Sequence, residues 1–168
     1  MGKAPEHRTL THRSAITTAA LALALATPSV ALALAQPATN TNKAVKVTVR
    51  VQGPDGLLFK GKVRTKGHDV TTAAGGTHKC DGTNGGANPS KVPTPTAALD
   101  DAAQKNGFTW DGAWYASFDD FSVDTIKNVS GGGSAYWNIA VNGTPTPVGG
   151  CQFKIVAGDR VSFTWTSF

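Results

Sequence analysis

The chain has 168 residues, and its 16 Lys or Arg against 11 Asp or Glu give a formal net charge of +5. This length is that of a single domain of ordinary size. The positive excess is small and no nucleic-acid-binding motif accompanies it, so we expect no nucleic-acid partner.

The N-terminal 35 residues have the pattern of a secretory signal peptide. Basic residues between Lys3 and Arg13 precede an apolar core at residues 15–26, and Ala33-Leu34-Ala35 is a cleavage site of the A-x-A type. The apolar run is shorter than the roughly 20 residues that a membrane-spanning helix needs. We therefore predict a protein that is secreted, extracellular or cell-wall associated, with 133 residues, a net charge of +3 and no membrane span after cleavage. A retained N-terminal anchor is the alternative.

Two strands are expected directly after a flexible leader at residues 36–44. Val45 to Val51 alternates apolar and polar side chains, which is typical of a half-buried strand. Gly53-Pro54-Asp55-Gly56 is a turn sequence, and Leu57 to Thr65 continues as the second strand of a hairpin. One face of that second strand is expected to hold Leu57, Phe59, Gly61, Val63 and Thr65.

Basic side chains recur at mostly even spacing in and around these strands. On strands this spacing predicts a one-sided basic stripe. A solvated strand face is the first interpretation, and a site for nucleic acid or another acidic polymer is the alternative. The residues concerned are Lys43, Lys46, Arg50, Lys60, Lys62, Arg64 and Lys66.

Residues 67–95 are predicted to form a long inserted loop, rich in glycine and threonine. Cys80 lies in this loop, and Cys151 lies in a second glycine-rich turn. Because the chain is predicted to be exported, we expect a disulfide between the two cysteines. A metal site of Cys80, His78 and His68 is the alternative.

A helix is expected between Thr94 and Gly107. Thr94 or Thr96 is a suitable N-cap, and Gly107 is suited to the position just after the helix. Ala98, Leu99, Ala102 and Ala103 are expected on the buried face, and Asp100, Asp101, Gln104 and Lys105 on the solvent face.

Six aromatic rings crowd between the helix and the next expected strand, which spans residues 121–128 and precedes a flexible hairpin tip at residues 130–134. Such a density of rings is typical either of a core or of a platform for a planar or sugar ligand. We assign most of the rings to the core and keep Trp110, Trp114 and Tyr115 as candidate ligand-binding residues. The rings belong to Phe108, Trp110, Trp114, Tyr115, Phe118 and Phe121.

The last third of the chain predicts the rest of the sheet. Tyr136 to Val141 alternates and ends at Asn142-Gly143, a strong hairpin signal. Residues 152–156 and 160–165 are the last expected strands. The order of elements predicts a single α+β domain in which one helix packs on a mixed, mostly antiparallel sheet.

Three motifs follow one another in a characteristic order: Thr96-Ala97-Ala98-Leu99-Asp100-Asp101-Ala102, then Tyr136-Trp137-Asn138-Ile139-Ala140-Val141-Asn142-Gly143, then Val156-Ala157-Gly158-Asp159-Arg160-Val161. With them, residues 45–168 resemble the transcobalamin-like C-terminal domain, a family found in exported bacterial proteins and, distantly, in vertebrate cobalamin carriers. The resemblance implies a β-grasp-like fold, and it implies that Trp137, Asn142 and Gly143 approach a ligand. The inserted loop at residues 67–95 departs from the family pattern.

Two classes of function follow from these observations. The first is a secreted, non-catalytic binding or cell-surface-associated module for a small molecule, a glycan or a cell-envelope component, in which the aromatic cluster, His68 and His78 supply contacts. The second is a small secreted hydrolase or metal-dependent enzyme that uses His68 or His78 with Asp69 or Asp81. No nucleophile or metal-binding motif supports catalysis, so we expect a protein that is not an enzyme and has no cofactor or metal.

Overall fold

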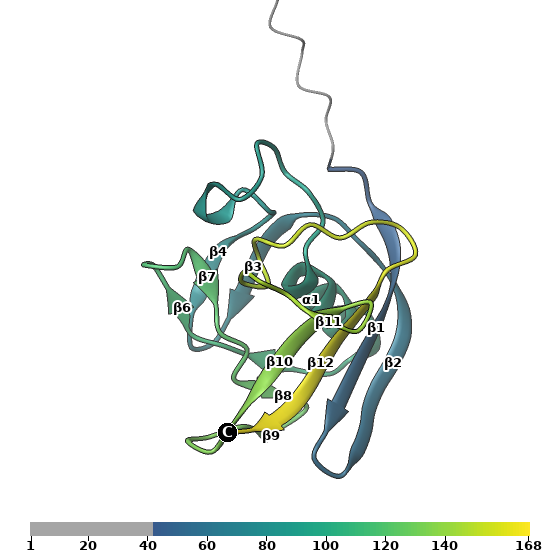
Figure 1. The fold of residues 1–168 in the computed structure, drawn as a ribbon, viewed down its shortest axis with the longest axis vertical. Coiled ribbons are helices and arrows are strands. Elements are labelled where there is room, and N and C mark those ends of the chain that lie inside the picture. The colour runs from purple at the N-terminus through teal and green to yellow at the C-terminus, as the bar shows by residue number, and fades with distance from the viewer. Residues whose placement is uncertain (1–41) are drawn as a thin grey trace, which may run out of the picture. The chain divides into compact units, whose positions relative to one another are not determined.

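The computed structural model describes residues 42–168, in one α-helix, one 3₁₀ helix and twelve strands (Figure 1). The predicted signal peptide and most of the predicted leader lie outside these residues. Within residues 42–168, neither helix has the length and apolar character needed to cross a bilayer.

The main sheet has five strands and confirms the α+β class with a mixed sheet. Two strands from opposite ends of the described chain, β1 and β12, are parallel neighbours, and all other neighbours in this sheet are antiparallel. The order across the sheet is β11 (Thr144–Pro145), β10 (Ala135–Val141), β12 (Arg160–Ser167), β1 (Val45–Gly53) and β2 (Gly56–Thr65).

The α-helix α1 (Pro95–Asn106) packs on one face of this sheet, over β1 and β2. Its ends are capped as predicted: Thr94 Oγ1 accepts a hydrogen bond from Ala97 N, and Gly107 has a φ of 66°, a left-handed conformation that glycine adopts at low cost. The inner face of α1 is mostly alanine, which lets the helix approach the sheet closely. The buried sheet residues on this side are Val47, Val49, Val51, Val63, Val161 and Phe163.

Asp100 differs from the prediction, because it is buried rather than on the solvent face of α1. Its carboxylate accepts hydrogen bonds from Trp110 Nε1, at 3.1 Å, and from Gln104 Nε2, at 2.6 Å. Burial raises the pKa of Asp100, and these two donors partly oppose the rise. The tryptophan indole thus supplies the partner that makes a buried carboxyl tolerable.

A bulge near the start of β2 changes its expected facing. Gln52 of β1 pairs with Leu57, whereas the preceding residue of β1 pairs with Phe59, so Leu58 is the extra residue. Leu58 packs against the core and Leu57 is 53% exposed. The prediction that Leu57 shares a face with Phe59 is therefore wrong, because strict alternation ends at the bulge.

The segment at residues 67–95 contains regular structure that the sequence analysis missed. A hairpin of β3 (His68–Thr72) and β4 (Gly76–Cys80) is followed by the 3₁₀ helix η1 (Asn84–Gly86). The buried residues of the β3–β4 hairpin are Val70, Thr72 and Cys80. Buried and exposed residues alternate in this hairpin. Threonine and cysteine occupy two of the buried positions, so the sequence lacks the apolar alternation that identifies a strand.

Short strands complete the described structure. Three of them form a small sheet of β5 (Trp110–Asp111), β8 (Thr125–Ile126) and β9 (Val129–Ser130), and two form the hairpin of β6 (Trp114–Tyr115) and β7 (Asp120–Phe121).

Three expectations about the second half of the chain are wrong. The strand predicted at residues 121–128 is divided between β7 and β8, and Lys127 and Asn128, with φ of 49° and 62°, turn the chain after β8. The predicted hairpin tip at residues 130–134 joins strands of two different sheets. Residues 152–156 form no strand, and Ile155 N donates a hydrogen bond to Pro93 O at 3.0 Å.

Candidate functional site

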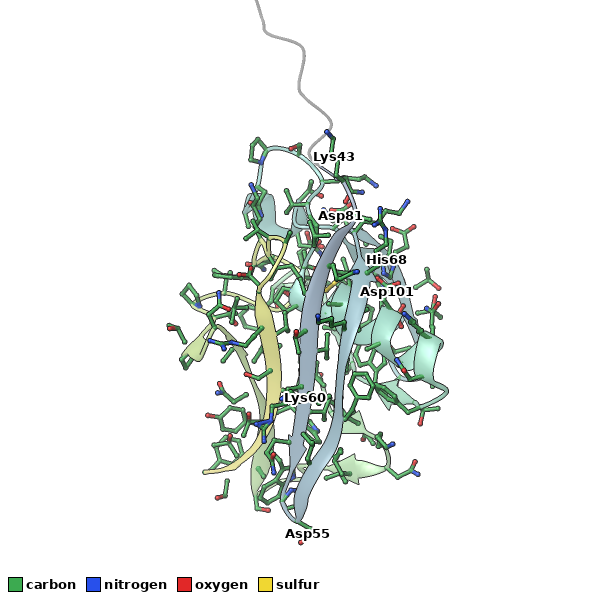
Figure 2. The ribbon with its side chains drawn as sticks, turned by 90° about the vertical axis from the view of Figure 1, so that its right-hand side faces the viewer. Lys43, Asp55, Lys60, His68, Asp81 and Asp101 are labelled. Atoms are coloured by element: carbon green, nitrogen blue, oxygen red, sulfur yellow. A yellow bond between two sulfur atoms is a disulfide. The ribbon has the colours of Figure 1, made fainter. Side chains whose placement is uncertain are left out.

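The histidine His68 lies beside α1, close to an acidic helix residue (Figure 2). Its Nδ1 donates a hydrogen bond to Asp69 O at 2.8 Å, and its Nε2 is 3.4 Å from the carboxylate of Asp101. Asp101 is the main reason that the pKa of His68 rises to about 9. At neutral pH the imidazole is therefore protonated, and a protonated imidazole cannot accept a proton as a general base.

His78 forms a second, separate contact. Its ring stacks on Trp114 with a centroid separation of 4.0 Å and an interplanar angle of 2°, and it meets the Phe121 ring edge-on with a centroid separation of 5.9 Å. The histidine thus fixes the orientation of Trp114 at the base of the β6–β7 hairpin.

The remaining predicted ligand-binding residues are also dispersed. Asn142 and Gly143 make the β10–β11 turn, with φ of 54° and 90°, and the Asn142 side chain bonds Asp159 and the backbone of Arg160. Trp110 is buried against α1. Trp137 and Tyr115, in contrast, line parts of one continuous depression.

This depression, which we call the apolar groove, runs between the β6–β7 hairpin and the turn at residues 148–152. Its first part is a cavity of about 460 Å³, walled by Tyr115, Phe118 and Val148, whose side chains are all exposed. Its second part, of about 550 Å³, continues along β10, and Phe121 and Gly149 belong to both parts. Apolar side chains gathered around a concave surface typically mark a binding site.

Two buried polar atoms lie along the second part of the groove. Trp137 lines it, and Thr96 lies directly behind Gly150, which also lines it. Neither Trp137 Nε1 nor Thr96 Oγ1 has a hydrogen-bond partner among the described residues. Buried polar groups are nearly always paired, so these two atoms are exceptions in the packing behind the groove lining.

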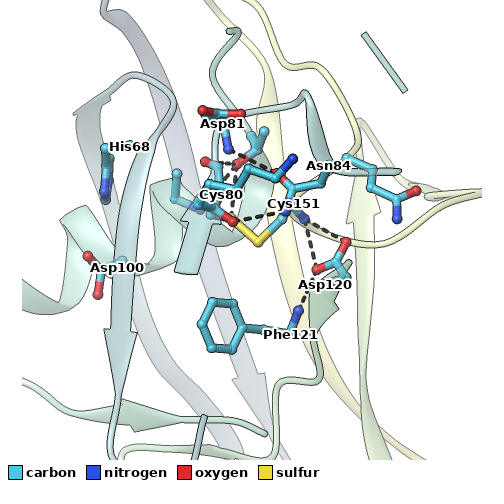
Figure 3. Close-up of a disulfide and its surroundings, with 12 residues drawn as sticks. His68, Cys80, Asp81, Asn84, Asp100, Asp120, Phe121 and Cys151 are labelled. Carbon is cyan, nitrogen blue, oxygen red and sulfur yellow. Dashed lines mark hydrogen bonds between the residues drawn. A yellow bond between two sulfur atoms is a disulfide. The ribbon is translucent and has the colours of Figure 1, made fainter. Parts of the chain in front are cut away.

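A buried carboxyl, that of Asp120, lines the first part of the groove (Figure 3). It accepts hydrogen bonds from Phe121 N, at 2.8 Å, and from Cys151 N, at 3.1 Å. No Lys, Arg or His in the described part of the chain forms an ion pair with it. Burial raises the pKa of Asp120 to about 7, so the group changes charge near neutral pH.

The disulfide between Cys80 and Cys151 is present and joins the end of β4 to the turn that carries Gly149 (Figure 3). Gly82 N donates a hydrogen bond to Cys151 O at 3.0 Å, beside the crosslink. Asn84 Nδ2 donates to the backbone of Asp119 at 2.8 Å. The crosslink and these bonds hold three distant chain segments together around Asp120.

The metal alternative is wrong, because both cysteine sulfurs are used in the disulfide. In residues 42–168 no three His, Cys, Asp or Glu side chains gather in a metal-binding arrangement.

The groove also contains four residues that the sequence pattern did not indicate: Phe118, Asp120, Val148 and Gln152. Gln152 Nε2 donates a hydrogen bond to Phe118 O at 2.7 Å, which links the two walls. Phe118 and Asp120 lie in the aromatic run that the sequence analysis singled out, but nothing local distinguishes them from core and surface residues of that run.

Gly149 makes the close packing around Asp120 possible. A Cβ at this position would lie 1.9 Å from Asp120 Oδ2. We expect Gly149→Ala to lower the free energy of unfolding by about 1–3 kcal/mol, because the carboxyl must move out of a packed position. Urea denaturation measures the change. Gly133→Ala is the control, since a Cβ there meets no atom within 4 Å; equal stability of the two variants would contradict the close approach.

Comparison with known proteins found similarity among solved structures alone. A scan against protein-family models gave no match, and a search of curated proteins gave none. Among solved structures, the crystal structure of haptocorrin in complex with Cbi is similar, with 14% sequence identity and a TM-score of 0.49. The similarity covers 77% of this chain and 27% of that one, so the chain spans about a quarter of the haptocorrin structure.

Proposed function

We propose that this chain is a secreted, non-catalytic binding module whose ligand occupies the apolar groove. The main support for this proposal is the position of Asp120. Its buried carboxyl has no cationic partner in the described residues and lines a cavity walled by exposed rings. A carboxyl with a strongly raised pKa in a cavity is a typical feature of a functional site. Tyr115, of the predicted ligand-binding residues, lies in the same wall.

The chemistry of the groove selects a small molecule with a flat apolar body and a cationic or hydrogen-bond-donating group. The body would lie against Tyr115 and Phe118, where the exposed apolar surface is large. The donor would face the Asp120 carboxyl, which has lone pairs beyond those that the two backbone N–H groups occupy. Trp137 would contact the molecule farther along, where this residue lines the second part of the groove.

The proposed secretion is supported by two independent features. The disulfide fits an oxidising compartment, and the first 35 residues have the composition of a signal peptide. We include in this proposal that residues 45–168 are a transcobalamin-like C-terminal domain with β-grasp topology.

The enzyme alternative gains no support from the described geometry. Asp81 pairs with Lys91 at 3.1 Å, and His78 is stacked on Trp114. His68 is protonated at neutral pH through its contact with Asp101. None of these groups is arranged as a base beside a nucleophile.

Calorimetric titration with two probes of matched size tests the charge preference of the groove. At pH 8 phenethylamine should bind about tenfold more tightly than 3-phenylpropionate, because ionised Asp120 attracts an ammonium and repels a carboxylate. Asp120→Asn should abolish the difference. Tyr115→Ala with Phe118→Ala should weaken both probes, whereas Leu57→Ala, an exposed apolar residue outside the groove, should change neither.

A wider panel of sugars, cobalamins, peptides and cell-wall polymers then searches for the natural ligand by its effect on the melting temperature. Equal affinity for the two matched probes, together with no stabilisation by any member of the panel, would contradict the proposed binding function.

A further inference from the structure

The face of the main sheet that points away from α1 carries a concentration of positive charge. Val47, Val49 and Val51 face the helix, so the alternate residues of β1 face outward, and the pairing extends this alternation to β2 and β12. The long strands β1, β2, β10 and β12 contain no Asp or Glu. The exposed cations of this basic face are Lys46, Arg50, Lys60, Lys62, Arg64 and Arg160.

The register of β1 and β2 places like charges directly opposite each other. Lys46 pairs with Arg64, and Arg50 pairs with Lys60. Opposed like charges destabilise a sheet. None of the six cations forms an ion pair with a carboxylate within residues 42–168.

The basic face is hollowed as well as charged. A depression of about 520 Å³ is lined by Arg50, Lys60 and Arg160, and also by Ser162 and Thr164. Figure 2 shows Lys60 beside the strands of this sheet, away from the labelled pair of His68 and Asp101. Cations around a row of hydroxyl groups can neutralise acidic groups and at the same time hydrogen-bond to neighbouring hydroxyls.

We propose that the basic face docks an extended acidic polysaccharide. Lys60, Lys62 and Arg64 recur at every second residue of β2, about 6.8 Å apart along the strand, which suits a linear polymer with charges in series. Ser162 and Thr164 suit sugar hydroxyls. The two rows of cations on β1 and β2 contain no aromatic ring on their outward side, and base stacking on such rings is the usual basis of single-stranded nucleic-acid binding.

This proposal is independent of the apolar groove, because the two surfaces have no lining residue in common. An acidic polymer would hold the secreted module near its source, while the groove remains open to a small molecule. Failure of either surface in its own test leaves the other proposal intact.

The test compares binding of the full chain to heparin, polygalacturonate, neutral dextran and poly(dT) over a series of salt concentrations. We expect binding to at least one acidic polysaccharide, weakened by salt, and none to dextran. Lys60→Glu with Lys62→Glu and Arg64→Glu should weaken this binding about tenfold or more, because three attractive contacts become repulsive.

The control variant makes the same change in net charge elsewhere, with Lys105→Glu, Lys127→Glu and Lys154→Glu, all exposed residues outside the basic face. It should lose much less affinity. The β2 variant should remain folded and melt at a higher temperature, since Lys46 and Arg50 then oppose acidic residues; should it not fold, Lys60→Gln with Lys62→Gln replaces it.

Three results would overturn the proposal: no binding to either acidic polysaccharide at low salt, equal losses in the β2 variant and the control variant, or tighter binding of poly(dT) than of both acidic polysaccharides. The last result would identify the face as a nucleic-acid surface.

Discussion

Replacing Cys80 and Cys151 together by alanine should lower the free energy of unfolding by about 4 kcal/mol. The crosslink closes a loop between residues 71 positions apart, and its removal restores to the unfolded chain the conformational freedom of that loop. A loss of this size is a large fraction of the stability of a domain of this length. Denaturant unfolding of the variant and of the oxidised wild type measures the difference, and wild type under strong reductant should behave as the variant does.

The loss should also be unevenly distributed. Amide hydrogen exchange should accelerate most at β4 and at the turn around Cys151, whose contacts depend on the crosslink, and least at Val49 and Phe163 in the main sheet. A difference in unfolding free energy below about 1 kcal/mol would show that the crosslink constrains the unfolded chain very little. Free thiols in wild-type protein purified without reductant would show that the crosslink does not form at all.

The parts of the fold that local sequence determines were predictable. Val45 to Val51 forms a strand because every second residue is a valine, and all but the first of these valines are buried in the sheet. The Thr94 side chain caps the start of α1 by accepting a backbone hydrogen bond. Gly107 caps the end because it adopts a left-handed conformation. Because the chain has only two cysteines, only one intramolecular disulfide was possible.

Local pattern was insufficient where pairing departs from simple alternation. The bulge on β2 exposes Leu57, and nothing in the run of apolar and basic residues around it marks the extra residue. The sequence of the β3–β4 hairpin predicts a loop, because its glycines and threonines are also typical of turns. Here tertiary contacts, among them the hydrogen bond from Thr72 to Gly112, decide the structure.

The candidate site was the least predictable feature, because it exists only after distant segments meet. Asp120 appears in the sequence as one of two adjacent acidic residues in an aromatic run. Its burial depends on Cys151, which is 31 residues away and donates to it, and on the absence of a side chain at Gly149. Sequence spacing carries no information about such a three-way contact.

Asp120→Asn should remove a large part of the dependence of stability on pH. In the folded protein the pKa of Asp120 is raised from 3.8 to about 7, so between these values the folded state binds a proton that the unfolded state has lost. The contribution of this group to stability is therefore greatest at and below about pH 4, and it falls by about 4 kcal/mol as the pH rises through 7. Urea denaturation of variant and wild type at a series of pH values gives the difference curve.

That difference isolates Asp120 from two other groups that titrate in the same direction. Burial raises the pKa of Asp100, and the contact with Asp101 raises the pKa of His68 to about 9, so both also favour the folded state at lower pH. Asp100 and His68 are unchanged in the variant, so their contributions to the pH dependence of stability cancel in the difference curve. Asp55→Asn, in the exposed β1–β2 turn, should keep the wild-type slope. If Asp120→Asn keeps it too, the carboxyl is not buried in solution, and the cavity lacks the buried carboxyl that we propose selects a ligand.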